Sequence, residues 1–455
     1  VFPTPPALSL LPSYLMIARR FCTQHLFKMA YSAAIGNGLM SSTPSLISRQ
    51  ELIGDVKVNV THGPVIMKDI ARGIADANKA EGNFNAFIVA NLDALHSQLQ
   101  VWRKELPRVQ QLYYAVKCNN DALIVKILAD LGLGFDVASR EEIDMILNMG
   151  ISADRIIYSN PNKQHSIIDH AYQTGVNLTV FGTKEELMKI VKHHSKPEVM
   201  MRIEFSDPPT NIRRKNGVNP IKKGPELLQF ASEMGVNVCG VSFHLRGGGD
   251  PAIYRLALQY VRDMFDAGKR LGHNMTIVNI GGGFSGGENG LPFDKAAAAL
   301  RQYIDDLFPD PNVRIVAEPG QFFATSTCSL VANVIAASEV PADYITGNEA
   351  DSGSIGYNYC INDGLYFTFS YFQHGHGQMI SGVPLEDKDG EEYPSTIWGH
   401  TCDSRDLIED KKMMRKLDVD DWIFYKNIGA YSLAASSTFN GFSRPMVNYV
   451  ISENL

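Results

Sequence analysis

Short apolar segments alternate with amphipathic segments from residue 112 to residue 317, and no other feature of the sequence constrains the fold as strongly. The apolar segments have the length and the β-branched or aromatic content of buried strands. They are Leu112–Val116, Gly134–Val137, Ile156–Tyr158, Asn177–Val180, Glu198–Ile203, Val238–Phe243, Ile277–Ile280 and Arg314–Ala317. Helical windows lie between them, at Ala122–Leu131, Arg140–Met149, His165–Thr174, Lys184–His193, Gly224–Met234, Pro251–Leu271 and Ala296–Leu307. Eight strands alternating with helices predict a parallel (β/α)8 TIM-type barrel, with an open doubly wound sheet as the alternative.

The alternation stops near Thr327, and the remaining sequence predicts an all-β domain. Its strand candidates are Ser329–Ala337, Tyr357–Ile361, Tyr366–Tyr371, Thr396–Trp398, Trp422–Tyr425 and Met446–Ile451. An edge strand within 52–61, a helix at 64–79 and a short strand at 86–90 precede the barrel. We expect residues 51–91 to join the β domain, which is then discontinuous. The predicted organisation is an extension at 1–50, this joining segment, a barrel at 92–327 and a C-terminal β domain at 328–455.

Composition narrows the classes of partner and compartment. The net charge of −7 argues against nucleic acid or an anionic membrane as the main partner. No apolar run is long enough to predict a membrane span. The six cysteines show no C-x-x-C spacing, which favours free thiols in a reducing, cytoplasmic compartment and predicts no metal site. Residues 1–50 contain no Asp or Glu, so a transit peptide is the alternative to a disordered extension.

Chemically versatile residues stand at the expected C-terminal ends of the barrel strands, where a barrel of this type carries its active site. They are Lys117, Asp136, Arg202, His244, the Gly281-Gly282-Gly283 turn and Glu318. A lysine held in an apolar wall has a lowered pKa, and its neutral amine can form a Schiff base with an aldehyde. The alternative is a lysine that ends its strand and reaches water.

The neighbours of the lysine favour the chemical interpretation. A glycine turn exposes backbone N–H groups to an anion such as phosphate, although such turns are often only turns. A histidine can stack on a flat ring, and a carboxylate can hold a proton on a ring nitrogen. A lysine, an anion nest, a histidine and a carboxylate together describe a site for pyridoxal 5′-phosphate.

With these residues in place, the sequence from about Gly63 to its end resembles the eukaryotic-type ornithine decarboxylases, which are pyridoxal-phosphate enzymes of the alanine-racemase-like fold. The matching segments are Tyr114–Asn119, Phe135–Ser139, Phe243-His244, Gly281–Phe284, Glu318–Gly320, Trp398–Asp403 and Asn427–Phe442. The resemblance implies a barrel with a β domain and a head-to-tail homodimer with shared active sites. It implies decarboxylation of a small amino acid, ornithine to putrescine in polyamine biosynthesis.

The resemblance also implies a role for each matching residue around the cofactor. Lys117 would bind the aldehyde, Glu318 would pair with the ring nitrogen, and His244 would stack on the ring. Supporting and phosphate-binding roles would fall to Asp136, Arg202, Gly283, Gly320 and Tyr431. The alternative for His244 is a core imidazole with its hydrogen bonds satisfied.

Further roles would come from the partner subunit of the dimer. Cys402 would protonate the carbanion left by CO2, with a packed thiol as the alternative. Asp403 would bind the distal amine of the substrate. Lys215 and Asp406 match a family pair that bridges the dimer, with a surface ion pair as the alternative.

Three departures from the family pattern lie in the site itself. Gly247 replaces a phosphate-binding serine, Gln321 replaces a phosphate-binding arginine, and His374-Gly375 replaces a Tyr-Asp pair whose aspartate binds the distal amine. Two lost hydrogen bonds to phosphate would cost about 3–6 kcal/mol, on the order of 10²–10⁴ in cofactor affinity. We therefore expect a decarboxylase with weakened or substrate-shifted activity, or an inactive regulator of the antizyme-inhibitor type that binds antizyme.

Overall fold

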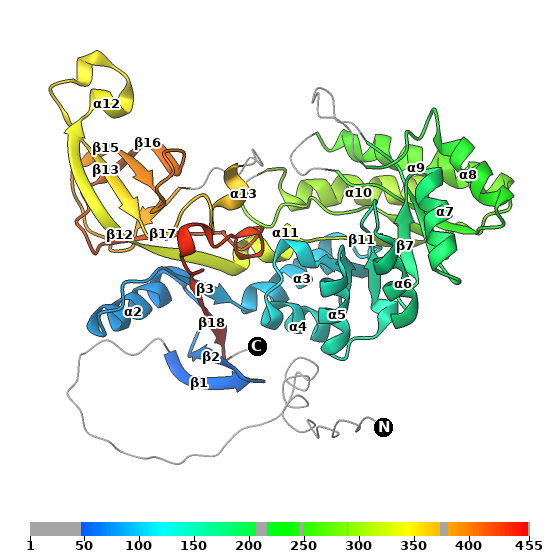
Figure 1. Ribbon diagram of the computed structural model, residues 1–455, viewed down its shortest axis with the longest axis horizontal. Coiled ribbons are helices and arrows are strands. Elements are labelled where there is room, and N and C mark those ends of the chain that lie inside the picture. Colours follow the sequence, from blue (N-terminus) through cyan, green and yellow to red (C-terminus); the bar gives the residue numbers. More distant parts are fainter. Residues whose placement is uncertain (1–46, 206–215, 246–249, 289, 374–380, 454–455) are drawn as a thin grey trace, which may run out of the picture.

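The computed structural model describes residues 47–205, 216–245, 250–288, 290–373 and 381–453. The chain forms a closed barrel and a separate ten-stranded sheet, and Figure 1 shows the helix-covered barrel beside the strand-rich part. The expectations for residues 1–46, Lys215, Gly247 and His374-Gly375 lie outside the described residues.

All eight barrel strands are parallel, and the last of them, β11, pairs with the first, β4. The strands are β4 (Gln111–Ala115), β5 (Gly134–Val137), β6 (Ile156–Tyr158), β7 (Leu178–Phe181), β8 (Glu198–Arg202), β9 (Val238–Ser242), β10 (Ile277–Asn279) and β11 (Arg314–Ala317). Val316 lies in register with Gln111, so the sheet has no free edge. The barrel is confirmed, and the open doubly wound sheet is excluded.

Helices follow the strands and cover the outside of the barrel (Figure 1). They are α3 (Asp93–Glu105), α4 (Ala122–Asp130), α5 (Arg140–Asn148), α6 (His165–Thr174), α7 (Lys184–His193), α8 (Gly224–Glu233), α9 (Ala252–Arg270), α10 (Phe293–Leu307) and the short α11 (Gln321–Ala324). Side-chain caps fix several helix starts: Asp121 accepts from the backbone N–H groups of Leu123 and Ile124, at 3.0 Å each. Each cap fixes the residue at which the helix begins, and therefore the end of the strand-to-helix loop in which site residues lie.

The second part is a sheet built from both ends of the chain. Its strands are β1 (Ile47–Ile53), β2 (Val56–Thr61), β3 (Phe87–Asn91), β12 (Cys328–Pro341), β13 (Ile355–Ile361), β14 (Val383–Pro384), β15 (Glu392–Trp398), β16 (Leu407–Arg415), β17 (Trp422–Tyr425) and β18 (Met446–Ser452). The C-terminal β18 lies between β2 and β3 and is parallel to both (Figure 1). Helices in this part are α2 (Met67–Ala80), α12 (Asp343–Thr346) and α13 (Ser370–Gln373).

Three sequence expectations for this sheet were wrong in detail. The single edge strand expected within 52–61 is a hairpin of β1 and β2, and β1 begins at Ile47, four residues before the expected start of the folded chain at residue 51. β16 was not expected at all. The strand expected at Tyr366–Tyr371 is a turn followed by α13.

The turn at 364–369 has a local cause. The buried Asp363 carboxylate accepts from the backbone N–H groups of Gly364 at 2.7 Å and Thr368 at 3.0 Å, and from the Thr368 hydroxyl at 2.6 Å. Side-chain-to-backbone bonds of this kind compete with strand pairing. They therefore override the β propensity of the aromatic residues that follow.

An aromatic cluster in the core supports the loop after β10. Trp102 packs against Phe284, Phe293 and Phe322 with ring centroids 5.0, 5.0 and 5.1 Å apart. Phe284 ends the glycine turn and is 2% exposed, so its burial anchors that turn against the barrel. No helix in the described ranges is long and apolar enough to cross a membrane.

Candidate active site

Lys117 lies at the C-terminal end of β4, in the single turn η1 (Val116–Cys118), and points toward β5. Its Nζ donates to Asp136 Oδ2 at 2.5 Å. The Asp136 side chain is fully buried and also accepts from the Ser159 hydroxyl. The lysine side chain itself is 43% accessible, so the reactive nitrogen is held by a buried carboxylate while a ligand can still reach the chain.

A second buried carboxylate, Glu318 after β11, faces the same lysine. Asn279 donates its side-chain N–H to Glu318 Oε1 at 2.6 Å, and the backbone N–H of Glu318 donates to Gly281 O at 2.7 Å. The Pro319 carbonyl accepts from Ala115 N at 3.4 Å, which ties the end of β11 to the end of β4. The barrel closure thereby brings residues some 200 positions apart to one site.

The charges of this cluster set its pKa values. Burial alone would lower the pKa of Lys117, but the charges of Asp136 and Glu318 raise it above the ordinary value of 10.5. The expected lowered pKa of Lys117 was therefore wrong. Burial and the charge of Asp136 raise the pKa of Glu318 to about 7. The neutral amine needed for attack on an aldehyde thus requires loss of the Lys117 proton, and the contact with Asp136 opposes that loss.

The glycine turn lies against Glu318 and His244. The Gly282 N–H donates to His244 Nδ1 at 3.2 Å. A Cβ added to Gly282 would lie 2.4 Å from the Glu318 carbonyl oxygen and 3.4 Å from the His244 ring, so only glycine permits this approach. Gly281 and Gly283 have φ of 66° and 87°, a left-handed conformation that glycine adopts without strain.

The remaining expected cofactor residues surround the lysine turn. Gly320 packs on Cys118, where an added Cβ would lie 2.9 Å from the cysteine Cβ. The Tyr431 N–H donates to the Cys118 carbonyl at 2.7 Å, which brings the β domain to the barrel. Gln321 opens α11 next to Gly320. Arg202 ends β8, where its charge acts on Glu318 and lowers the pKa of that group against the effect of burial.

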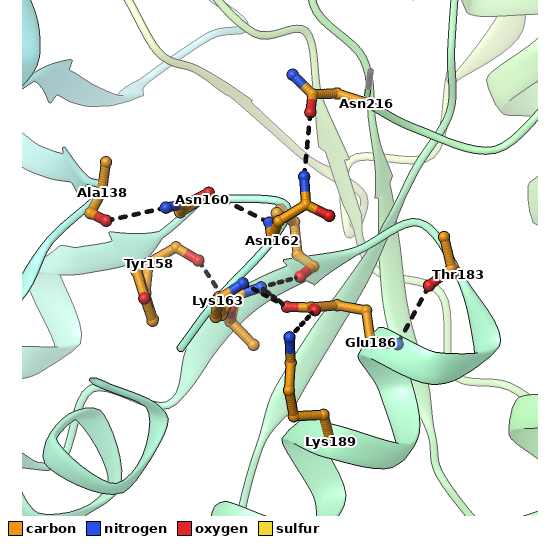
Figure 2. Close-up of polar contacts among 11 residues, drawn as sticks. Ala138, Tyr158, Asn160, Asn162, Lys163, Thr183, Glu186, Lys189 and Asn216 are labelled. Carbon is orange, nitrogen blue, oxygen red and sulfur yellow. Dashed lines mark hydrogen bonds and ion pairs between the residues drawn. The ribbon is translucent and has the colours of Figure 1, made fainter. Parts of the chain in front are cut away.

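A second lysine, Lys163, stands at the same end of the barrel and is buried, and Figure 2 shows its polar contacts. The side chain of Lys163, in the loop after β6, is 1% exposed. Its Nζ donates to the Val180 carbonyl at 2.5 Å and to Glu186 Oε1 at 3.2 Å. Burial lowers the pKa of Lys163 to about 8 against the opposing charge of Glu186. Glu186 also pairs with Lys189 at 2.6 Å. The charged groups of Lys163 and Glu186 are therefore bonded to partners within this chain.

Cys402 and Asp403 lie elsewhere, in the loop between β15 and β16 of the β domain. Cys402 Sγ donates to Asn440 Oδ1 at 3.6 Å. Asp403 accepts from the Tyr366 hydroxyl and from Arg405. In the part of the chain that the structure describes, no hydrogen bond or ion pair joins Cys402 or Asp403 to Lys117 or Asp136. One chain therefore presents two separate groups of site residues.

Asp406 is buried in the β domain. It is 1% exposed, and its carboxylate accepts from Leu365 N at 2.7 Å and from Thr401 N and Oγ1 at 3.1 and 2.6 Å. These bonds hold the loop that carries Cys402 and Asp403. The pair expected between Asp406 and Lys215 stays a prediction, because Lys215 lies outside the described residues.

The structure adds residues that the sequence analysis missed. Glu142 accepts from Ala138 N at 2.6 Å and, being largely buried, has a raised pKa. The Ser139-x-x-Glu142 spacing of a helix cap was a visible signal for it. Tyr366, Arg405 and Asn440 had no comparable signal, because their contacts join turns whose shape the pattern does not predict.

The residues present fit pyridoxal phosphate. Two buried carboxylates meet the cations of Lys117 and Arg202 in one cluster, and the Glu318 carboxylate would pair with a protonated ring nitrogen. Gly282 packs tightly against the Glu318 carbonyl, and this contact with the left-handed Gly283 holds the glycine turn beside the His244 ring. A lysine, a carboxylate and a histidine ring beside a glycine turn fit this cofactor. The N–H groups of Gly281 and Gly282 donate to Asn279 Oδ1 and His244 Nδ1, so the expected anion nest is not formed by these two groups.

Comparisons with known proteins agree with this geometry. A family profile described as the pyridoxal binding domain of pyridoxal-dependent decarboxylases matches residues 92–325. Ornithine decarboxylase of Caenorhabditis elegans is 46% identical over 90% of this chain and 98% of its own length. Antizyme inhibitor 2 of Xenopus laevis is 36% identical over 88% of this chain and 89% of its own length. The arginine decarboxylase of Paramecium bursaria Chlorella virus, solved with agmatine, is 30% identical, with a TM-score of 0.77 over 84% of this chain and 100% of that one.

Proposed function

Because this chain belongs to the ornithine decarboxylase family of pyridoxal-dependent decarboxylases, we propose that it is a carboxy-lyase that removes the α-carboxylate of a small amino acid. We take ornithine as the reference substrate, with putrescine as the product, because relatives of this chain are named ornithine decarboxylase. The observation that carries the proposal is the contact of Lys117 with Asp136, beside Glu318 and the glycine turn at Gly282.

Each residue of the lysine cluster has a role in holding the cofactor. Lys117 would attach it covalently, Glu318 would hold the proton on its ring nitrogen, and His244 would stack on the ring. Asp136 holds the lysine ammonium, and the charge of Arg202 favours the ionised form of Glu318 against the effect of burial. When bound, pyridoxal phosphate supplies the electron sink for the electron pair that CO2 leaves behind. Gly283, Gly320 and Tyr431 would border the phosphate, with Gln321 in the place of an arginine.

The second group of residues supports a homodimer with shared sites. Cys402 holds a proton on Sγ that can be delivered to the substrate carbon, and Asp403 carries the charge that a distal amine would meet. Since neither is bonded to Lys117 within its own chain, we propose that both enter the site of a partner subunit. A dimer of this kind leaves each isolated chain without a complete site.

A second candidate function is a regulator that binds antizyme without catalysis. The likeness to antizyme inhibitor 2 favours it, as do the departures at Gly247, Gln321 and Gly375. The intact contacts of Lys117, Glu318 and Cys402 favour the enzyme, because a regulator has no need of them. A cytoplasmic location is part of the proposal and is supported by the free cysteines 118, 239, 328, 360 and 402.

The experiment that tests the function has two parts. Added pyridoxal phosphate should produce the near-visible absorbance of a lysine-bound cofactor, and the loaded protein should release CO2 from at least one amino acid in a panel with ornithine, lysine and arginine. The matched control is Lys117→Ala. A wild-type protein with neither absorbance nor CO2 release would replace the enzyme proposal with the regulator.

A further inference from the structure

The carboxylate of Asp403 has no free acceptor site in this structure. Arg405 donates to it through three groups: its backbone N–H reaches Oδ1 at 2.9 Å, its Nε reaches Oδ1 at 3.1 Å and Oδ2 at 3.2 Å, and its Nη2 reaches Oδ2 at 2.6 Å. The Tyr366 hydroxyl donates to Oδ2 as well. A carboxylate offers about four lone-pair sites, so four donors saturate it.

The donors are held in place by the surrounding turns. The Tyr366 ring stacks on Phe439, with centroids 4.5 Å apart, and its carbonyl accepts from Ser437 N and Oγ. Arg405 Nη2 also donates to the Tyr366 hydroxyl at 3.2 Å. The Arg405 fork therefore lies in a preformed frame, which reduces the entropy lost in forming the ion pair.

The pair changes the charge at the tip of this loop. The Arg405 and Tyr366 hydrogen bonds hold the pKa of Asp403 well below its ordinary value, so the carboxylate is ionised and its charge is balanced by the guanidinium. The Arg405 side chain is 81% exposed, and among the described residues its Nη1 has no hydrogen-bond acceptor. The surface presented to a ligand is thus a neutral pair with hydrogen-bond donors at its outer edge.

From these contacts we infer that Arg405 is a specificity-determining residue that turns the enzyme away from substrates with a distal ammonium and toward substrates whose side chain ends in an uncharged amide or ureido group. The inference rests on the proposed function, in which Asp403 meets the distal end of the substrate. A substrate ammonium must displace Arg405 from Asp403 and then lies beside a second cation. A carbonyl oxygen can instead accept from the free guanidinium N–H groups.

The test compares wild type with Arg405→Leu, after loading with pyridoxal phosphate. The kcat/KM for CO2 release is measured with ornithine and with citrulline and glutamine. Binding of 1,4-diaminobutane is measured by calorimetry as a readout independent of turnover. Arg301→Leu is the matched control, because Arg301 is a 43% exposed arginine on α10. Gel filtration checks that all three proteins have the same assembly.

The expected result is a wild-type preference for citrulline or glutamine over ornithine. In Arg405→Leu, kcat/KM for ornithine rises about tenfold or more and 1,4-diaminobutane binds more tightly, while Arg301→Leu behaves as wild type. A wild-type preference for ornithine, or equal effects of Arg405→Leu on all substrates, overturns the inference. A lack of cofactor absorbance and of CO2 release in every protein instead overturns the proposed function, and the inference with it.

Discussion

Lys117 and Lys163 stand at the same end of one barrel, each in contact with a carboxylate, and yet their surroundings are opposite. Lys117 is 43% accessible and faces both Asp136 and Glu318, and its pKa is raised. Lys163 is 1% exposed, is enclosed by Glu186 and a backbone carbonyl, and has a pKa lowered to about 8 (Figure 2). Burial makes a lysine less basic but also shuts it off from ligands. Access and a second facing carboxylate, rather than burial, distinguish the candidate cofactor lysine.

Substitution of Lys117 has the largest expected effect on the contrast between the two lysines. In Lys117→Ala we expect decarboxylation to fall by at least about 10³-fold, because no other group can take over covalent attachment. Stability should fall less than in a Lys163 variant, since water can reach Asp136 in place of the ammonium. CO2 release and urea unfolding measure the two effects, and activity that survives the substitution would remove Lys117 from its assigned role.

Lys163→Met should have the opposite profile. Removing one partner of a buried pair leaves Glu186 uncompensated on that side and should lower the free energy of unfolding by about 3–5 kcal/mol. Turnover per folded molecule should be largely retained. The double variant Lys163→Met/Glu186→Leu should recover much of the loss, which urea unfolding measures. An undiminished stability of Lys163→Met would show that the enclosed pair is not a structural element.

The two lysines also differ in the sign of their pH dependence. The unfolded chain binds the Lys163 proton more tightly than the folded chain does, so between pH 8 and pH 10.5 the contribution of Lys163 to stability rises. At about 1.36 kcal/mol for each pKa unit, the rise is on the order of 3 kcal/mol. The raised pKa of Lys117 has the reverse effect: its contribution is complete below 10.5 and is lost at higher pH.

Unfolding curves across this pH range, taken on wild type and on Lys163→Met/Glu186→Leu, isolate the enclosed lysine. As the pH rises, the free energy of unfolding of wild type should increase relative to that of the double variant. Parallel curves for the two proteins would contradict a depressed pKa at Lys163.

The site around Lys117 also depends on the glycine turn at Gly282. Gly282→Ala places a Cβ 2.4 Å from the Glu318 carbonyl, which must shift the turn and should weaken pyridoxal phosphate binding by about tenfold or more. Gly73→Ala in α2, where an added Cβ meets nothing within 4 Å, is the control and should leave cofactor affinity unchanged. Equal dissociation constants for wild type and Gly282→Ala would separate the glycine turn from the cofactor site.

The barrel was predictable from the sequence, because its strands are buried on both faces and appear as short apolar segments between helical windows. The edge strand β16, with the sequence LIEDKKMMR, was missed since a charged edge strand lacks that signal. The turn at 364–369 was taken for a strand because the hydrogen bonds of Asp363, not residue propensity, decide its shape.

The site was predictable only as far as residue types at strand ends allow. Lys117, Asp136 and Glu318 were found in this way, but the sign of the Lys117 pKa change was not, because it depends on two carboxylates that converge only when the barrel closes. The saturation of Asp403 by Arg405 and Tyr366 depends on a turn and a ring stack with no sequence pattern.

The most direct test of the contrast between the two lysines is chemical mapping of the cofactor. The protein is loaded with pyridoxal phosphate and reduced with borohydride, which converts the bond between lysine and cofactor into a stable secondary amine. The masses of its peptides are then measured by mass spectrometry. We predict a single pyridoxyl phosphate group per chain, on the peptide that contains Lys117. Attachment to Lys163, or no attachment at either lysine, would contradict the account.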